Sequence, residues 1–188
     1  MQKWVISIIE TFGYIGIFLL ILLENIFPPI PSEIILTFSG FMTSISELET
    51  IGVITVSTLG AYIGAVILYV IGRSVDYGKK ILKFKQTHLN RTYQWFEKYG
   101  NKAVFIGRLV PVVRSLISIP AGMSRMAFIP FSLYTIIGTL IWNTILTYLG
   151  VIAGENYETV SYFIDKYSLI VVLMIIGIII YRYLKKKF

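Results

Sequence analysis

The sequence contains no cysteine and only one histidine in 188 residues. Without cysteine, the chain cannot form a disulfide framework, a thiolate nucleophile or a thiolate metal site. The single histidine, His88, lies in a polar stretch rich in lysine, and no second histidine exists to share a metal ion or a proton relay. We therefore predict no cofactor, no metal site and no catalytic role for His88.

Charged residues are also scarce, at 14% of the chain, whereas about a quarter is usual in soluble domains. Hydrophobic residues make up 56%, the mean hydropathy is +0.76, and the apolar residues form long runs. These features indicate a single membrane domain over residues 1–188. The net charge of +7 favours basic cytoplasmic loops over nucleic-acid binding in so apolar a chain, so no nucleic-acid partner is predicted.

Several apolar runs reach the ~20 residues that a membrane-spanning helix needs. Three do so plainly: Ile51–Gly72, Phe131–Ala153, and Ser168–Tyr183 with its flanks. A fourth run, Trp4–Leu23, is long enough but contains Glu10 and two glycines. It is either a full span or a surface helix followed by the first arm of a hairpin. We favour the second alternative, because Phe12–Leu23 then matches Glu33–Met42 in length.

Two further apolar segments are interrupted by prolines, which stop helices. The arm Glu33–Met42 has ten residues, which as a helix is about 15 Å long and covers half of a ~30 Å hydrocarbon core. Such broken, half-length segments are typical of re-entrant hairpins. We predict two of them, at about residues 12–42 and 103–128. The residues expected to shape them are Pro28, Pro29, Pro31, Pro111, Pro120 and Gly122.

Loop charges predict the orientation. The basic loop at residues 73–102 and the tail Lys185–Lys187 should be cytoplasmic, and the acidic loops should face outward. The two hairpins then open from opposite faces, and each precedes a spanning helix. The predicted fold is therefore an all-α polytopic membrane protein with two opposed re-entrant helical hairpins and about three to four spanning helices. The halves, residues 1–72 and 103–188, form an inverted repeat, which in transporters places the binding site near the midplane.

Four ionisable residues lie in the broken segments beside the prolines: Glu24, Glu33, Arg108 and Arg114. Such groups cost ~2.5–3.5 kcal/mol each at a helix centre on insertion scales, so they indicate function by default. One alternative is that they pair with one another and brace the hairpins. The sharper hypothesis is that the arginines bind a lipid phosphate and the glutamates carry protons or gate the arginines. An empty site could also be held by those same ion pairs.

Arginine suits a phosphate because its planar fork donates two parallel hydrogen bonds and stays charged at any working pH. Pro111 lies between Arg108 and Arg114 and would let both point into one cavity. The charge of a glutamate in such a cavity can depend on which face is open, because desolvation and a nearby arginine act on it in opposite directions. Asn143, in mid-helix, is predicted to support the site, either by bonding a hairpin or by joining two helices, which is the commoner role of such a residue.

The motifs resemble those of the DedA family of SNARE-associated, VTT-domain membrane proteins. The resemblance rests on residues 24–33 (ENIFPPIPSE), residues 105–123 with two prolines and two arginines, and the glycine-rich residues 60–73. It covers nearly the whole chain. It implies two facing re-entrant hairpins in a small helix bundle, and an activity of moving lipid across the bilayer. The family's acidic pair corresponds to Glu24 and Glu33, and its arginine pair to Arg108 and Arg114.

Some members of the family carry aspartate at a longer spacing, whereas Glu33 follows a compact Pro-Pro-Ile-Pro here. This form resembles the branch that recycles undecaprenyl phosphate, which implies a multi-pass transporter of the bacterial cell membrane that returns this lipid to the cytoplasmic leaflet. The implied partners are the anionic lipid, the bilayer, protons as a coupling ion and a second copy of the chain. The alternatives are a flippase or scramblase for phosphatidylethanolamine, a membrane lipid phosphatase, and a structural or assembly protein without substrate.

Overall fold

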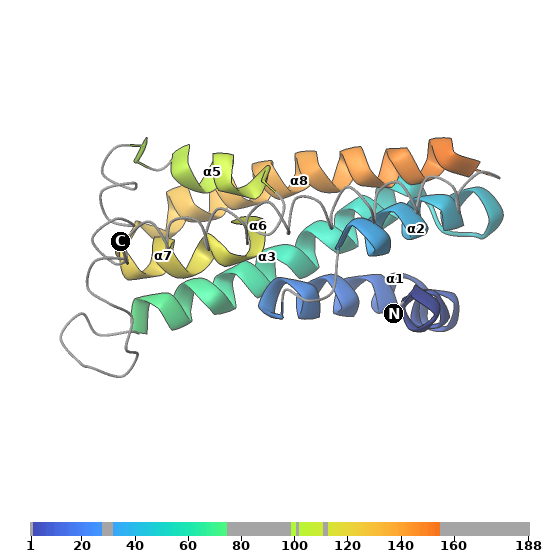
Figure 1. The fold of residues 1–188 in the computed structure, drawn as a ribbon, viewed down its shortest axis with the longest axis horizontal. Helices are drawn as coiled ribbons and strands as arrows, with labels where there is room; N and C mark the ends of the chain where they lie inside the picture. Colours follow the sequence, from blue (N-terminus) through green and yellow to red (C-terminus); the bar gives the residue numbers. More distant parts are fainter. Residues whose placement is uncertain (1, 28–31, 75–98, 101, 111–112, 155–188) are drawn as a thin grey trace, which may run out of the picture.

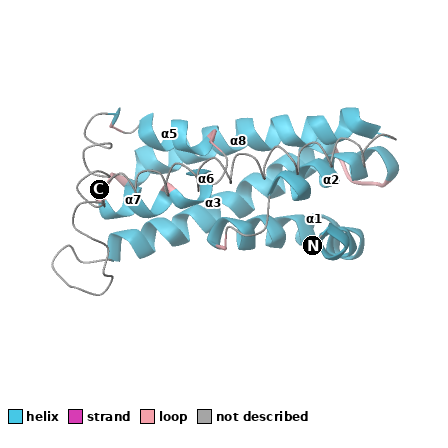
Figure 2. Cartoon of the chain, in the orientation of Figure 1, coloured by secondary structure: helices cyan, strands magenta, loops and turns pink. Residues whose placement is uncertain are grey.

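The computed structural model describes residues 2–27, 32–74, 99–100, 102–110 and 113–154. Every element in this part of the chain is a helix, and Figure 2 shows them packed side by side. The elements are α1 (Gln2–Ile26), α2 (Ser32–Ile45), α3 (Thr50–Ser74), α5 (Lys102–Arg108), α6 (Val113–Leu116), α7 (Ser118–Met123) and α8 (Phe128–Ala153). The prediction of an all-α protein is confirmed.

Three of these helices are long and apolar enough to cross a membrane. They are Trp4–Ile26 within α1, together with α3 and α8. The predicted spans Ile51–Gly72 and Phe131–Ala153 are thus confirmed as helices, whereas Ser168–Tyr183 lies outside the described residues. Large apolar side chains remain exposed along the outer faces of α3 and α8, as expected for surfaces that contact lipid.

The first apolar run is divided at Gly13. This residue has φ 53° and ψ −127°, a conformation that glycine adopts readily and other residues avoid. In Figure 1 the chain before Gly13 is seen end-on, while the rest of α1 runs along the long axis of the molecule. The break therefore falls close to the boundary expected at Phe12. The re-entrant course of the following arm, residues 14–26, stays a prediction.

The described part of the second broken segment consists of three short helices. α5 ends at Arg108, α6 begins at Val113, and Pro111 between them lies outside the described residues. Pro120 does not end a helix but lies in the first turn of α7. Because Pro120 has no N–H to donate to the carbonyl of Leu116, the helix is interrupted between α6 and α7.

The two halves of the chain pack in the same way. α1 lies against α3 and α5 lies against α8, while α2 crosses to α8 and α7 crosses to α3. At each crossing, a glycine of either helix packs against a backbone carbonyl of the other helix. A Cβ on Gly40 would overlap the carbonyl oxygen of Thr147, and one on Gly150 would overlap that of Thr37. In both cases the carbonyl belongs to the residue three positions before the partner glycine.

The crossing of α7 with α3 repeats this arrangement. A Cβ on Gly122 would overlap the carbonyl oxygen of Tyr69, and one on Gly72 would overlap that of Ile119. Gly122 therefore serves close helix packing, the usual role of small residues between membrane helices, rather than a bend of the hairpin. The matching contacts support the inverted-repeat arrangement inferred from the sequence.

Alanine at Gly150 or Gly122 should destabilise the protein, because the new methyl group meets backbone that cannot move aside. Overpacked sites lose ~1–3 kcal/mol, and we expect both variants at the upper end of that range. Gly52→Ala is the matched control, since its Cβ would meet only the far end of the Tyr14 ring, which can rotate away. Thermal unfolding of the purified variants measures the difference. Equal melting temperatures for all three would contradict the close contacts.

Candidate functional site

The four ionisable residues of the broken segments lie at helix ends that meet inside the bundle. Glu24 is in the last turn of α1, Glu33 in the first turn of α2, Arg108 at the end of α5 and Arg114 in α6. Glu24 and both arginines are buried, and Glu33 is half-buried. Glu24 interacts electrostatically with the other three, so the residues form one cluster across both halves of the chain.

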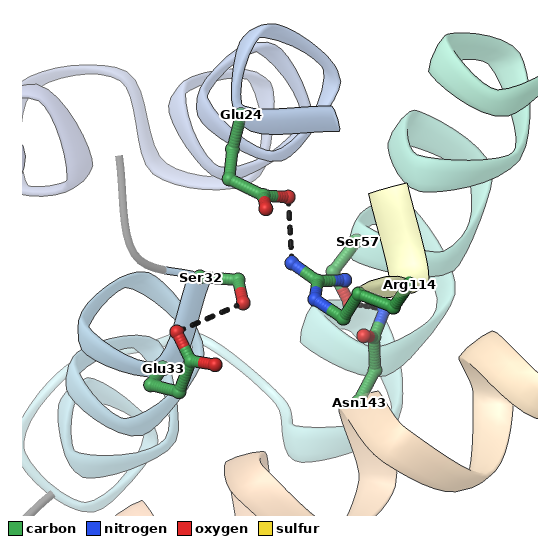
Figure 3. Close-up of polar contacts among 6 residues, drawn as sticks. All are labelled: Glu24, Ser32, Glu33, Ser57, Arg114 and Asn143. Atoms are coloured by element: carbon green, nitrogen blue, oxygen red, sulfur yellow. Dashed lines mark hydrogen bonds and ion pairs between the residues drawn. The ribbon is translucent and has the colours of Figure 1, made fainter. Parts of the chain in front are cut away.

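Glu24 and Arg114 form a buried ion pair. Arg114 Nη2 lies 2.6 Å from Glu24 Oε2, and both side chains are at least 95% buried. Figure 3 shows the two side chains reaching toward each other from α1 and α6. At this distance and burial the contact is strong, and it ties the first half of the chain to the second.

Arg108 is in a different situation, although it is only 1% exposed. Its Nη2 donates a 2.7 Å hydrogen bond to Ser118 Oγ of α7. Its Nε and Nη1 have no hydrogen-bond partner among the described residues. An unbonded buried donor costs about 1–3 kcal/mol, and more when it is charged. Arg108 thus presents donors that an anion could satisfy.

The space for Arg108 comes from Gly138 of α8. A Cβ at Gly138 would lie 2.8 Å from the Cβ of Arg108 and 3.3 Å from its Cγ. The aliphatic stem of the arginine therefore packs against the backbone of α8, where a larger residue would displace it. The end of α5 and the middle of α8 are adjacent for this reason.

The carboxylate of Glu33 makes weaker polar contacts than that of Glu24. Ser32 donates a 3.3 Å hydrogen bond to Glu33 Oε2, and Figure 3 shows both side chains on the side of Arg114 that faces α2. A carboxylate in the first turn of a helix is favoured by the helix dipole. Glu33 makes no ion pair among the described residues, so its carboxylate is held less tightly than that of Glu24.

The cluster holds two carboxylates and two guanidiniums, whose formal charges cancel. The bracing hypothesis accounts for Arg114, which is paired, but not for Arg108. An incoming phosphate could bond the free nitrogens of Arg108, and it could also bond Arg114 if Glu24 released it. The geometry therefore suits an anion whose arrival exchanges one partner of Arg114 for another.

Asn143 takes the commoner of its two expected roles. Its side-chain nitrogen donates to Ser57 Oγ at 3.1 Å and to Thr58 Oγ1 at 3.4 Å, both on α3. Asn143 therefore joins α8 to α3 instead of bonding a hairpin, although Figure 3 places it beside Arg114. Pro28, Pro29, Pro31 and Pro111 lie outside the described residues, so their effect on the hairpins stays a prediction.

Two residues of the cluster were not found from the sequence. Ser118 holds Arg108, and Asn25, fully buried beside Glu24, has no partner for its side-chain nitrogen or oxygen among the described residues. Asn25 offered a signal, because an amide next to Glu24 in an apolar run is costly unless it is bonded. Ser118 offered none, since serines are common in membrane helices.

Residues 30–152 match the VTT domain family. A Lactococcus lactis protein named alkaline phosphatase-like protein is 44% identical, with the match covering 100% of this chain and 94% of that protein. The undecaprenyl phosphate transporter A of Staphylococcus aureus is 41% identical over 100% of this chain and 98% of its own. Protein DedA of Escherichia coli is 29% identical over 89% of this chain and 77% of its own. No solved structure matches the chain.

Proposed function

Because this chain belongs to the VTT-domain, or DedA, family of membrane proteins, we propose that it is a lipid transporter that returns undecaprenyl phosphate to the cytoplasmic leaflet of a bacterial cell membrane. Similarity along the whole chain to a protein named undecaprenyl phosphate transporter A supports the choice of lipid. The observation that carries the proposal is Arg108, a fully buried guanidinium two of whose nitrogens have no hydrogen-bond partner in the part of the chain that the structure describes.

The proposed cycle exchanges ion pairs. Among the described residues, Glu24 is paired with Arg114, while the side chain of Arg108 is hydrogen-bonded to Ser118. The phosphate binds Arg108 first, because that residue has free donors, and then displaces Glu24 from Arg114. The polyprenyl tail stays in the lipid while the head group crosses the cluster.

A phosphate adds negative charge to a cluster that is neutral without it. Protonation of Glu24 or Glu33 would offset that charge, so binding should be linked to proton uptake. Glu33 is the better candidate, since Glu24 is already paired with Arg114. This is the physical basis for coupling the cycle to protons. A proton would be taken up on the outer side of the membrane and released on the cytoplasmic side, where the lysine-rich tail is predicted to lie.

Transport can be measured with purified protein in liposomes that contain undecaprenyl phosphate. An added phosphatase reports the lipid exposed in the outer leaflet, and a membrane-impermeant amine reagent reports phosphatidylethanolamine in the same vesicles. We expect the protein to expose the whole pool of undecaprenyl phosphate and to leave the distribution of phosphatidylethanolamine unchanged. Equal movement of both lipids would favour a general scramblase, and no movement of either would contradict the proposal.

The name of the Lactococcus relative raises the phosphatase alternative, which the same vesicles test. A transporter leaves its lipid intact, so no inorganic phosphate should appear before the external enzyme is added. Steady release of phosphate by the protein alone would show an enzyme instead.

A proton gradient should change the rate of transport in wild-type protein. We expect acid on the side of phosphate entry to accelerate it severalfold, because a protonated carboxylate offsets the incoming charge. Glu33→Gln removes this titration while keeping the shape of the side chain, so the variant should respond much less to the gradient. A wild-type rate that ignores the gradient would argue against coupling, without bearing on the phosphate site.

A further inference from the structure

One ridge of α8 carries four buried polar residues at intervals of four: Thr135, Thr139, Asn143 and Thr147. Residues four apart form a continuous row along a helix surface. The outer face of the same helix is apolar and exposed, with residues such as Ile137 and Ile141. α8 thus has its polar side inward and its apolar side outward, which suits a wall between lipid and a polar interior.

The hydroxyls of this ridge lack the partners that such groups usually find. Serine and threonine in helices commonly donate to a carbonyl of their own helix, as Thr37 does to Glu33 O at 2.6 Å. The hydroxyls of Thr135, Thr139 and Thr147 have no partner among the described residues. The side-chain oxygen of Asn143 is likewise unbonded in that part of the chain.

The ridge passes the charged cluster and extends on both sides of it. Gly138, one residue before Thr139, is where the stem of Arg108 packs. Asn143 is bonded to α3 near Arg114, and the backbone of Thr147 lies against Gly40 of α2. The ridge therefore runs from the stem of Arg108, past the contact of Asn143 with α3, to the crossing of α8 with α2.

We propose that this α8 ridge is the neutral wall of a hydrated path along which the phosphate head group moves to and from Arg108 and Arg114. The proposal rests on the proposed function and adds residues to the site. The threonine hydroxyls can donate to phosphate oxygens without the charge that would trap the anion, and the side-chain oxygen of Asn143 can accept a hydrogen bond from water. The arginines therefore hold the head group and the ridge lets it pass.

The absence of natural cysteine allows a direct test of hydration. Single cysteines are placed at the four ridge positions, with Ile137→Cys on the exposed face and Leu146→Cys as a buried apolar control on the same helix. The full-length protein in liposomes is treated with an anionic, membrane-impermeant methanethiosulfonate. We expect the ridge cysteines to react at least tenfold faster than both controls, and undecaprenyl phosphate to slow their reaction.

Ridge cysteines that react no faster than Leu146→Cys would overturn the proposal. A reaction rate of the ridge cysteines that does not change when undecaprenyl phosphate is added would also overturn the proposal, because the path would then hold water but not the head group. The cysteine measurements do not depend on transport, so failure of the ridge proposal can be told apart from failure of the proposed function. The second failure would show as an absence of lipid movement by the wild-type protein.

A second set of variants tests the hydroxyls in transport. Thr135→Val, Thr139→Val and Thr147→Val preserve shape and should each slow transport about twofold to tenfold, the effect of losing one neutral hydrogen bond. Thr37→Val is the matched control, equally buried but with its hydroxyl already bonded within α2, and should transport at the wild-type rate. Equal rates for ridge variants and control would count against the ridge.

Discussion

Replacing Arg108 with glutamine should lower the affinity for undecaprenyl phosphate about tenfold to a hundredfold while leaving the protein at least as stable as the wild type. The loss corresponds to the ~1.5–3 kcal/mol of a hydrogen bond to a charged group. The preserved stability follows from Nε and Nη1, which have no hydrogen-bond partner among the described residues, since unbonded donors of a buried charged group oppose folding. Binding of the lipid to purified protein and thermal unfolding measure the two effects.

Two further variants make this result specific. Arg108→Lys keeps the charge but loses the planar fork, so it should recover only part of the affinity. Arg125→Gln is the matched control, because Arg125 follows the same broken segment but is exposed. We expect it to bind lipid normally. If Arg108→Lys bound and transported like the wild type, Arg108 would act only through its charge and the planar fork would have no part in binding the phosphate.

The sequence was sufficient to single out the four residues of the candidate site, because the bilayer makes ionisable residues conspicuous. Glu24, Glu33, Arg108 and Arg114 stand out in apolar runs, and the structure brings all four into one electrostatic cluster. The long helices were predictable for the same reason, since apolar length is a strong signal. The division of the first run near Phe12 was also foreseen, from the matching lengths of the arms.

The pairing within the cluster could not be predicted. Which arginine meets Glu24 depends on how α6 packs against α1, and the sequence does not specify that packing. The reciprocal glycine contacts were equally hidden, because a glycine in a membrane helix does not reveal its partner. The polar ridge of α8 had a visible signal, the spacing of four residues from Thr135 to Thr147, but the spacing alone does not show whether the hydroxyls are bonded within their own helix.

The difference between the two arginines has a consequence for the energetics of the site. Under the proposed function, Arg108 is kept for binding at a cost in stability, the pattern expected where function and stability compete. Arg114 and Glu24 stabilise each other, so in the proposed cycle this ion pair opens when the lipid binds. A phosphate that takes the place of Glu24 on Arg114 allows the ion pair to open, because neither guanidinium is then left unpaired.

Breaking the ion pair should therefore have the largest effect on stability of any single change in the site. Glu24→Gln leaves the charge of Arg114 buried without its partner at 2.6 Å, and Arg114→Gln does the same to Glu24. Removing one member of a buried pair costs ~3–5 kcal/mol. We expect both variants to unfold at clearly lower temperatures than the wild type, and saturating undecaprenyl phosphate to restore part of the loss in Glu24→Gln, where the phosphate can take the place of the carboxylate on Arg114.

The double variant Glu24→Gln/Arg114→Gln separates pairing from function. With both charges removed, no uncompensated ion remains, so its stability should return most of the way to that of the wild type. Transport should stay lost, because only Arg108 remains to hold the phosphate. If the double variant were instead as unstable as the sum of the single variants, the contact between Glu24 and Arg114 would contribute nothing. If it transported lipid at the wild-type rate, Arg114 would have no part in moving the head group.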